Sequence, residues 1–124
     1  MDFYSYGLRK ELLQALEQHG FDTPMEVQDR ILSLSEDWNS DLIVQARTGS
    51  GKTLAFLLPL MQEMKIGEKT PQILILAPTR ELAQQTAEES EFLGSFLKIK
   101  TASLVGGMDI YPQLRTLSHG VAVI

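Results

Sequence analysis

The chain has 124 residues, of which 44% are hydrophobic and 22% charged, the size and balance of one globular domain. It has no cysteine, no apolar run of membrane-spanning length and no signal peptide, which excludes a disulfide framework and favours a cytoplasmic protein without a membrane partner. The net charge of −5 argues against broad, charge-driven adhesion to nucleic acid, but it allows local phosphate contacts by backbone groups and single arginines.

Two amphipathic helices are expected in the N-terminal third of the chain. Leucines recur at helical spacing between Gly7 and Gly20, which predicts the first helix. A second helix is predicted to start with Thr23 as its N-cap and Pro24 at its first position, with Glu26 completing a capping box. The turn-forming residues 39–41 then separate this helix from the next element.

Apolar runs and helical patterns alternate through the rest of the chain. Helices are predicted from about Gly51 to Gly67, from about Arg80 to Phe96, and around Ile110, Leu114 and Leu117. The runs predicted to be strands are 42–44, 73–77, 99–105 and 121–124. This alternation predicts an α/β protein, a three-layer sandwich with a mostly parallel sheet.

The stretch Ala46–Thr53 lies between the first predicted strand and a helix, and it has the features of a phosphate-binding loop. A triphosphate needs several converging N–H donors and an approach free of side chains, which Gly49 and Gly51 provide. The helix N-terminus and the Lys52 ammonium would face the phosphates, and the Thr53 hydroxyl would ligate Mg²⁺. The other loop residues expected at the phosphates are Ala46, Arg47, Thr48 and Ser50. A plain glycine and serine connection is the alternative, but the Gly-Lys-Thr ending favours the nucleotide site.

Three segments together resemble the DEAD-box ATP-dependent RNA helicases. They are the loop written AxTGSGKT, the run PTRELAQQ at 78–85, and Gly20-Phe21 followed by Pro24 and Gln28. A generic phosphate-binding loop opens with glycine, whereas this family characteristically has alanine at the position of Ala46. The resemblance spans Phe3 to Ile124 and implies the first half of an N-terminal, RecA-like P-loop NTPase domain, with a Q motif, motif I, motif Ia and a GG element.

The resemblance implies that the segment around Gln28 recognises adenine, for which an amide side chain offers a matching donor and acceptor. Phe3 stands at the family's upstream aromatic position and either packs against the base or belongs to the core, and Phe21 is favoured as a core residue. Met25 stands where the family usually carries threonine or serine, which weakens a hydroxyl contact near the loop.

The resemblance also implies contacts to the RNA backbone. Motif Ia, with Pro78, Thr79 and Arg80, would offer a helix N-terminus and a guanidinium to a phosphate. The alternative is that Thr79 is only a cap and Arg80 only a solvated residue. The pair Gly106-Gly107 resembles the GG element, another backbone contact.

The sequence stops before the DEAD box, the SAT motif and the second RecA-like domain of the family, so we interpret it as a truncated part of an active helicase that binds ATP but hydrolyses it poorly alone. Loss of the intervening strands would leave strand edges unpaired, which predicts rearrangement or self-association. A binding or interaction fragment without turnover is the alternative function. A small-molecule kinase would share the loop but would leave the other two segments unexplained.

Overall fold

A computed structural model describes residues 2–34, 40–121 and 123–124. The chain divides into two compact units, Met1–Glu63 and Met64–Ile124, and each is described by itself. Of the residues in the predicted turn at 39–41 and the predicted strand at 121–124, Asn39 and Ala122 lie outside the described residues.

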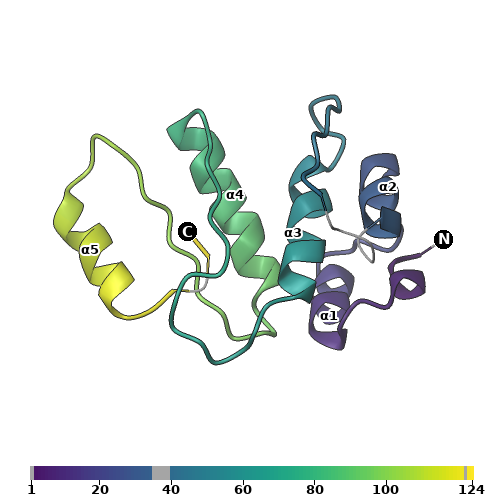
Figure 1. Ribbon diagram of the computed structural model, residues 1–124, viewed down its shortest axis with the longest axis horizontal. Coiled ribbons are helices and arrows are strands. Elements are labelled where there is room, and N and C mark those ends of the chain that lie inside the picture. Colours follow the sequence, from purple (N-terminus) through teal and green to yellow (C-terminus); the bar gives the residue numbers. More distant parts are fainter. Residues whose placement is uncertain (1, 35–39, 122) are drawn as a thin grey trace. The chain divides into compact units, whose positions relative to one another are not determined.

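The first unit is built from helices. A short 3₁₀ helix, η1 (Phe3–Tyr6), precedes α1 (Lys10–Gln18), α2 (Glu26–Leu34) and α3 (Lys52–Gln62). The prediction of a helix between Gly7 and Gly20 is confirmed by α1, and α2 packs directly against α3 (Figure 1). The apolar side chains that fill the core of this unit include Leu12, Leu16, Ile31, Leu32, Leu57, Leu58 and Met61.

The predicted start of α2 at Thr23 is wrong. The helix begins at Glu26, and the carbonyl of Met25 accepts the first helical hydrogen bond, from the Asp29 N–H at 2.9 Å. Gln28 takes the role that was expected of Glu26, because its Oε1 accepts a hydrogen bond from the Met25 N–H at 2.9 Å. A side chain at the third helical position that reaches back to the N-cap N–H forms half of a capping box.

The run 42–44, predicted to be a buried strand, is extended but unpaired within its unit. The exposed fractions of Leu42, Ile43 and Val44 are 44%, 101% and 43%. No bridge joins this run to another segment in the described part of the first unit. A strand is defined by hydrogen bonds to a neighbouring segment, and without one an apolar run has no sheet to enter.

The second unit contains α4 (Arg80–Leu93), α5 (Ile110–Ser118) and the beginnings of a parallel sheet. Val123 forms parallel bridges with both Ile73 and Thr101. Among the described residues, four hydrogen bonds between main-chain groups hold these segments together. They run from Ile75 N–H to Ile124 O, Ile124 N–H to Ile73 O, Ala102 N–H to Val123 O and Val123 N–H to Lys100 O, over 2.8 to 3.2 Å.

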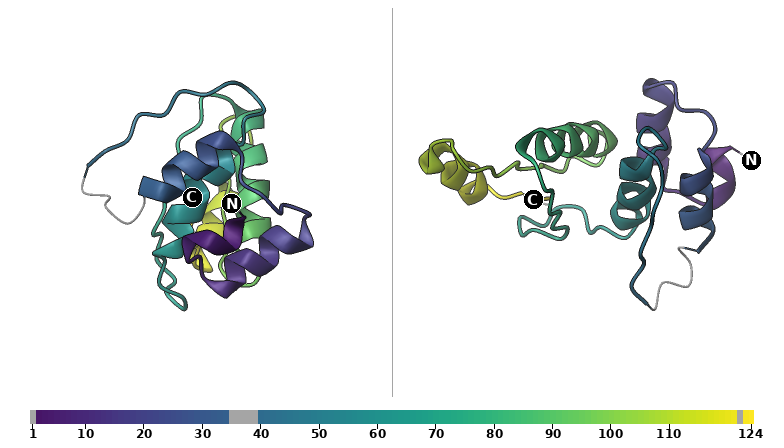
Figure 2. Two further views of the ribbon diagram at one scale, coloured as in Figure 1. Left: turned by 90° about the vertical axis from the view of Figure 1, so that its right-hand side faces the viewer. Right: turned by 90° about the horizontal axis from the view of Figure 1, so that it is seen from above.

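The predicted three-layer sandwich is not formed by the described residues, which contain isolated bridges rather than strands of ladder length. Leu74 and Leu76, predicted to be buried within the sheet, are 70% and 87% exposed. Helix α5 is confirmed, although it buries none of its side chains, and the views of the second unit show it held apart from α4 (Figure 2). Exposed backbone edges and apolar side chains in this unit are therefore open to further pairing.

Candidate functional site

The loop before α3 has the glycine conformations that a phosphate-binding loop requires. Gly49 and Gly51 have φ angles of +80° and +84°, and Gly51 is the N-cap of α3, which begins at Lys52. A hydrogen bond of 3.2 Å from the Ser50 N–H to the Arg47 carbonyl closes the turn. The left-handed conformation is costly for any residue with a Cβ, so both glycines are needed for this path. The predicted sequence of glycine turn and helix is confirmed.

The loop is closed on itself through its lysine. The Lys52 Nζ donates a hydrogen bond of 2.6 Å to the carbonyl of Ala46, at the start of the loop. Ser50 Oγ is buried and, among the described residues, has no hydrogen-bond partner. Arg47, Thr48, Gly49 and Lys52 are exposed, whereas Ala46, Ser50, Gly51 and Thr53 are half-buried. To bind an anion at this loop, the Lys52 ammonium would therefore have to break its hydrogen bond to the Ala46 carbonyl.

Gln28 joins α2 to the end of the loop. Its side chain is 3% exposed, its Oε1 accepts from the Met25 N–H, and its Nε2 donates to the Gly51 carbonyl at 3.2 Å. The fit is tight, since a Cβ built on Gly51 would lie 2.3 Å from Gln28 Nε2 and 3.0 Å from Met25 Sδ. Both ends of the amide are thus engaged by the protein's own main chain.

Of the two phenylalanines considered near the predicted adenine site, Phe3 takes the core position that was one of its two options, and the prediction for Phe21 is wrong. Phe3 is 2% exposed and lies in the core of the first unit, whereas Phe21, favoured as a core residue, is 41% exposed. The neighbouring Tyr6 hydroxyl donates a hydrogen bond to Asp29 Oδ1 on α2. Burial, reinforced by the bond to Asp29, raises the pKa of Tyr6 to about 12. This tyrosine therefore fixes the N-terminal segment to α2 as a neutral donor.

The second unit brings the two predicted RNA segments together. Thr79 is confirmed as the N-cap of α4, because its Oγ1 accepts a hydrogen bond of 3.1 Å from the Leu82 N–H. Arg80 begins the helix, and its guanidinium lies so close to Gly107 that a Cβ built there would be 2.8 Å from its Nη2. Gly107 has a φ angle of +78°, and Pro78, Thr79, Arg80, Gly106 and Gly107 are all exposed.

Sequence reasoning missed the residue that holds the glycine turn. The Gln113 side chain, from α5, accepts a hydrogen bond from the Val105 N–H and donates to the carbonyls of Val105 and Asp109. Asp109 in turn caps α5, its Oδ1 accepting from the Tyr111 N–H at 3.0 Å. An Asp one position before a helical pattern signals the cap, but nothing in the sequence signals the reach of Gln113 back to the loop.

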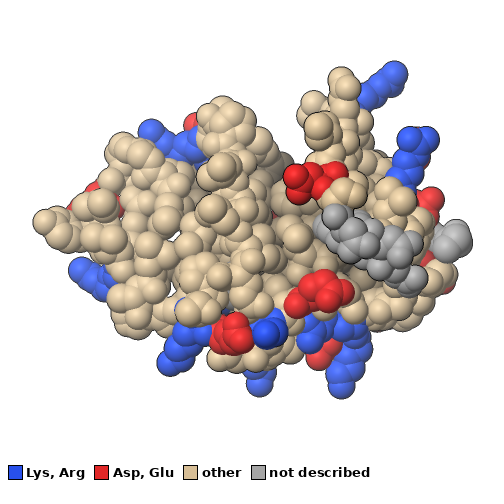
Figure 3. All heavy atoms as spheres, viewed as in Figure 1, with Lys and Arg blue, Asp and Glu red and all other residues tan. Residues whose placement is uncertain are grey.

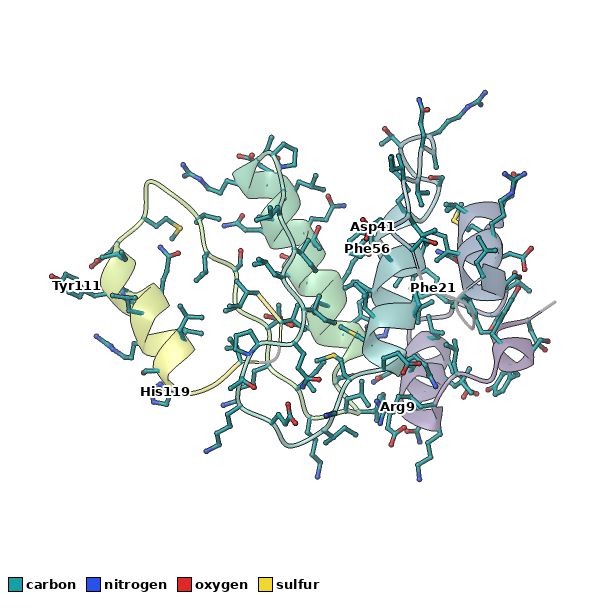
Figure 4. All side chains as sticks on the ribbon, in the orientation of Figure 1. Arg9, Phe21, Asp41, Phe56, Tyr111 and His119 are labelled. Atoms are coloured by element: carbon teal, nitrogen blue, oxygen red, sulfur yellow. The ribbon has the colours of Figure 1, made fainter. Side chains whose placement is uncertain are left out.

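Basic and acidic side chains are mixed on the face shown in Figure 3, where Lys and Arg are interspersed with Asp and Glu. Tyr111 and His119 stand at opposite ends of α5 in Figure 4, and His119 Nδ1 is 2.7 Å from the Arg115 carbonyl. Where residues are described, no three acidic, histidine or cysteine side chains gather as metal ligands, and no helix has the length and apolar character to cross a membrane.

The comparisons with known proteins agree on one family. The model of the DEAD/DEAH box helicase family matches residues 25–124. The chain belongs to this family. It is 38% identical over 122 residues to the DEAD-box ATP-dependent RNA helicase CshA of Geobacillus kaustophilus. The matched region covers 98% of this chain and 26% of that protein.

Solved DEAD-box proteins share its fold. A DEAD box protein from the hyperthermophile Methanococcus jannaschii is 37% identical with a TM-score of 0.87, over all of this chain and 34% of that one. Saccharomyces cerevisiae Dbp5, solved with RNA and ADP BeF3, is 32% identical with a TM-score of 0.80, over 98% of this chain and 30% of that one. The chain thus spans about a quarter to a third of the DEAD-box relatives it matches.

Proposed function

We propose that this chain is the ATP- and RNA-binding part of a DEAD-box RNA helicase that remodels RNA using ATP hydrolysis. The observation that carries the proposal is the glycine loop capping α3, with Lys52 at the first helical position, in a chain of this family. The name of CshA and the RNA and ADP BeF3 in the Dbp5 structure support both ligands.

Phosphate binding is proposed at the loop 46–53. The N–H groups at the start of α3 are unpaired within the helix and its dipole is positive there, so both attract a phosphate. The Lys52 ammonium would exchange the Ala46 carbonyl for phosphate oxygens. An ammonium gains more from a phosphate oxygen than from a neutral carbonyl, because both partners of the new bond are charged.

The residues at the loop also fit a magnesium ion. Mg²⁺ is usually held by few protein oxygens together with substrate phosphates and water, and in a phosphate-binding loop the hydroxyl after the lysine is one of them. Here that residue is Thr53, half-buried at the second position of α3. The ion would neutralise phosphate charge during phosphoryl transfer. Phosphoryl transfer depends on positioned charges around the phosphates, and we infer that these 124 residues by themselves bind nucleotide and turn it over slowly.

Adenine recognition is proposed for Gln28, whose amide is already bonded to the main chain of Met25 and Gly51. The amide has the donor and acceptor that adenine requires. It would have to exchange its bonds to Met25 and Gly51 for bonds to the base. Phe3 would pack against the base only after leaving the core, so we assign adenine first to Gln28.

RNA binding is proposed for the surface formed by Pro78, Thr79, Arg80, Gly106 and Gly107. The N-terminus of α4 offers N–H groups, and the Arg80 guanidinium lies over the Gly107 turn, so both are available to one stretch of sugar-phosphate backbone. Contacts of this kind position a nucleic acid without reading its bases. The mixture of basic and acidic side chains on the face in Figure 3 fits such local binding.

We propose further that the fold is a RecA-like, three-layer sandwich in which the paired segments of the second unit belong to a larger parallel sheet. The parallel bridges at Val123 and the likeness to solved DEAD-box proteins support this. The exposed run 42–44 and the exposed residues Leu74 and Leu76 would pack into or pair with neighbouring strands. Expressed alone, the 124 residues are expected to self-associate through these edges, which sedimentation velocity would detect.

Nucleotide binding is tested with Lys52→Ala, followed by equilibrium binding of a fluorescent ATP analogue. Losing a charge-assisted bond to phosphate is expected to weaken binding by at least about tenfold. Lys10→Ala is the matched control, because Lys10 is likewise an exposed first residue of a helix, α1, outside the loop. Equal affinity of both variants and the parent chain would remove the loop from the nucleotide site.

Competition with adenine and guanine nucleotides then tests Gln28, since only adenine should be favoured by its amide. ATP turnover with and without RNA separates the two candidate functions, because slow but measurable, RNA-stimulated turnover supports the helicase part and no turnover supports the binding fragment. A binding fragment without turnover is the alternative function. Brisk, RNA-stimulated hydrolysis by the 124 residues would exclude the binding fragment and would also contradict the slow turnover proposed above.

A further inference from the structure

A single side chain spans the glycine turn of the second unit. Gln113 Oε1 accepts from the Val105 N–H at 2.9 Å, and Gln113 Nε2 donates to the Val105 carbonyl at 3.2 Å and to the Asp109 carbonyl at 3.1 Å. The bonded residues lie on the two sides of Gly106-Gly107. One half-buried amide therefore fixes both ends of the loop whose tip is fully exposed.

The turn needs such support for a physical reason. Two adjacent glycines have more conformational freedom than any other pair, so an unsupported turn loses more entropy when it is ordered. The paired part of the preceding segment ends at Thr101 and Ala102, and the turn itself has no side chain to hold it. Gln113 supplies the missing restraint from the first turn of α5, which Asp109 caps independently.

We propose that Gln113 is a positioning residue that holds the Gly106-Gly107 turn, next to the Arg80 guanidinium, in the conformation that meets the RNA backbone. The inference rests on the proposed RNA-binding function of this surface. Gln113 itself touches no RNA in this scheme. It lowers the entropy that the loop loses on binding, as preorganisation does in other interfaces.

The chain offers a matched control in the same unit. Gln72 forms an equivalent clamp on another loop, accepting from the Lys65 N–H at 2.8 Å and donating to the Lys65 carbonyl at 2.8 Å. Gln72→Ala and Gln113→Ala each remove an amide that bonds both main-chain groups of one residue. They differ in which loop is released.

The experiment measures binding of a labelled single-stranded RNA to the 124-residue chain at low salt by fluorescence anisotropy. Gln113→Ala is expected to weaken RNA binding by about three- to tenfold, the range given by the loss of one net hydrogen bond. Gln72→Ala is expected to leave it unchanged. Amide exchange supplies a second readout, in which the Val105 N–H of Gln113→Ala should exchange at least about tenfold faster.

The outcomes distinguish a failure of the proposed RNA-binding surface from a failure of the role proposed for Gln113. If the parent chain binds no RNA, the proposed RNA surface fails, and the inference fails with it. If the parent chain binds RNA and Gln113→Ala binds equally well, the surface stands and the positioning role of Gln113 is overturned. Equal weakening by Gln72→Ala and Gln113→Ala would also overturn it, because a general loss of stability would then explain both. An unchanged exchange rate at Val105 would refute the clamp directly.

Discussion

Replacing Gln28 should reveal how tightly α2 is coupled to the loop before α3. Gln28→Ala removes two hydrogen bonds to main-chain groups, one to the Met25 N–H and one to the Gly51 carbonyl. At about 0.5 to 1.5 kcal/mol for each bond, the free energy of unfolding should fall by about 1 to 3 kcal/mol. Burial of the side chain places the effect in the upper half of that range, since the released groups lose partners away from water.

Gly51→Ala should be destabilising for two separable reasons. Its φ of +84° costs an alanine about 1 to 2 kcal/mol. In addition, the new Cβ would lie 2.3 Å from Gln28 Nε2, so the amide must move away. The loss of its hydrogen bond to the Gly51 carbonyl should lower the free energy of unfolding by a further amount of about 0.5 to 1.5 kcal/mol. In the Gln28→Ala background the cost of displacing the amide is gone, while the cost of the positive φ and the approach to Met25 Sδ remain, so the double variant should be less destabilised than the sum by about 1 kcal/mol.

Urea denaturation followed by circular dichroism measures all four members of this cycle. Gly49→Ala is the control, because Gly49 has a similar φ of +80° and open space where its Cβ would lie. Its cost should add to that of Gln28→Ala without coupling. Additive costs for Gly51→Ala and Gln28→Ala would refute the packing of the amide against the loop.

Three further predictions follow from single contacts. Met25→Thr should raise the free energy of unfolding by about 0.5 to 1 kcal/mol, because a hydroxyl at the N-cap of α2 completes the capping box begun by Gln28. A lower unfolding midpoint in urea would contradict this prediction. Thr79→Ala should cost about 1 kcal/mol by uncapping α4 and should weaken RNA binding, whereas unchanged stability would show that the bond to the Leu82 N–H is dispensable. The pKa of Tyr6 in the folded chain, about 12, exceeds that of an unfolded tyrosine, so the stability that Tyr6 contributes is complete below about pH 10 and is lost as the pH rises through about 12. An absorbance titration of the parent chain compared with Tyr6→Phe should show this late ionisation. A single tyrosine transition near pH 10 would exclude the raised pKa.

Local signals were sufficient for the presence of the helices and for the outline of the loop, but not for every helix end, since the helix predicted to reach about Gly67 ends at Gln62. Thr79 before an amphipathic pattern correctly marked the start of α4, and Gly51 followed by Lys52 marked the start of α3. The start of α2 was predicted wrongly at Thr23, because the restraint comes from the side chain of Gln28 inside the helix rather than from a residue before it. A pattern of side chains before a helix does not reveal such a contact.

The sheet was beyond the reach of local signals. The runs 42–44 and 73–77 have the composition of buried strands, yet composition does not say whether a neighbouring segment is present to pair with them. The contact of Lys52 with the Ala46 carbonyl and the reach of Gln113 are likewise decided by three-dimensional proximity. These contacts set the conformation in which the loop 46–53 and the Gly106-Gly107 turn would meet a ligand, and the sequence motifs do not reveal them.

The central place of Val123 has a kinetic consequence. It joins segments near Ile73 and Thr101 that lie far apart in the sequence, so neither pairing forms until the long loops between them have closed. The local helices α4 and α5 should therefore form early in refolding, and the parallel pairing should come late and limit the rate. Until then Ile73 and Val123, which are buried in the folded unit, would also be exposed, and the yield of refolding should fall steeply as protein concentration rises.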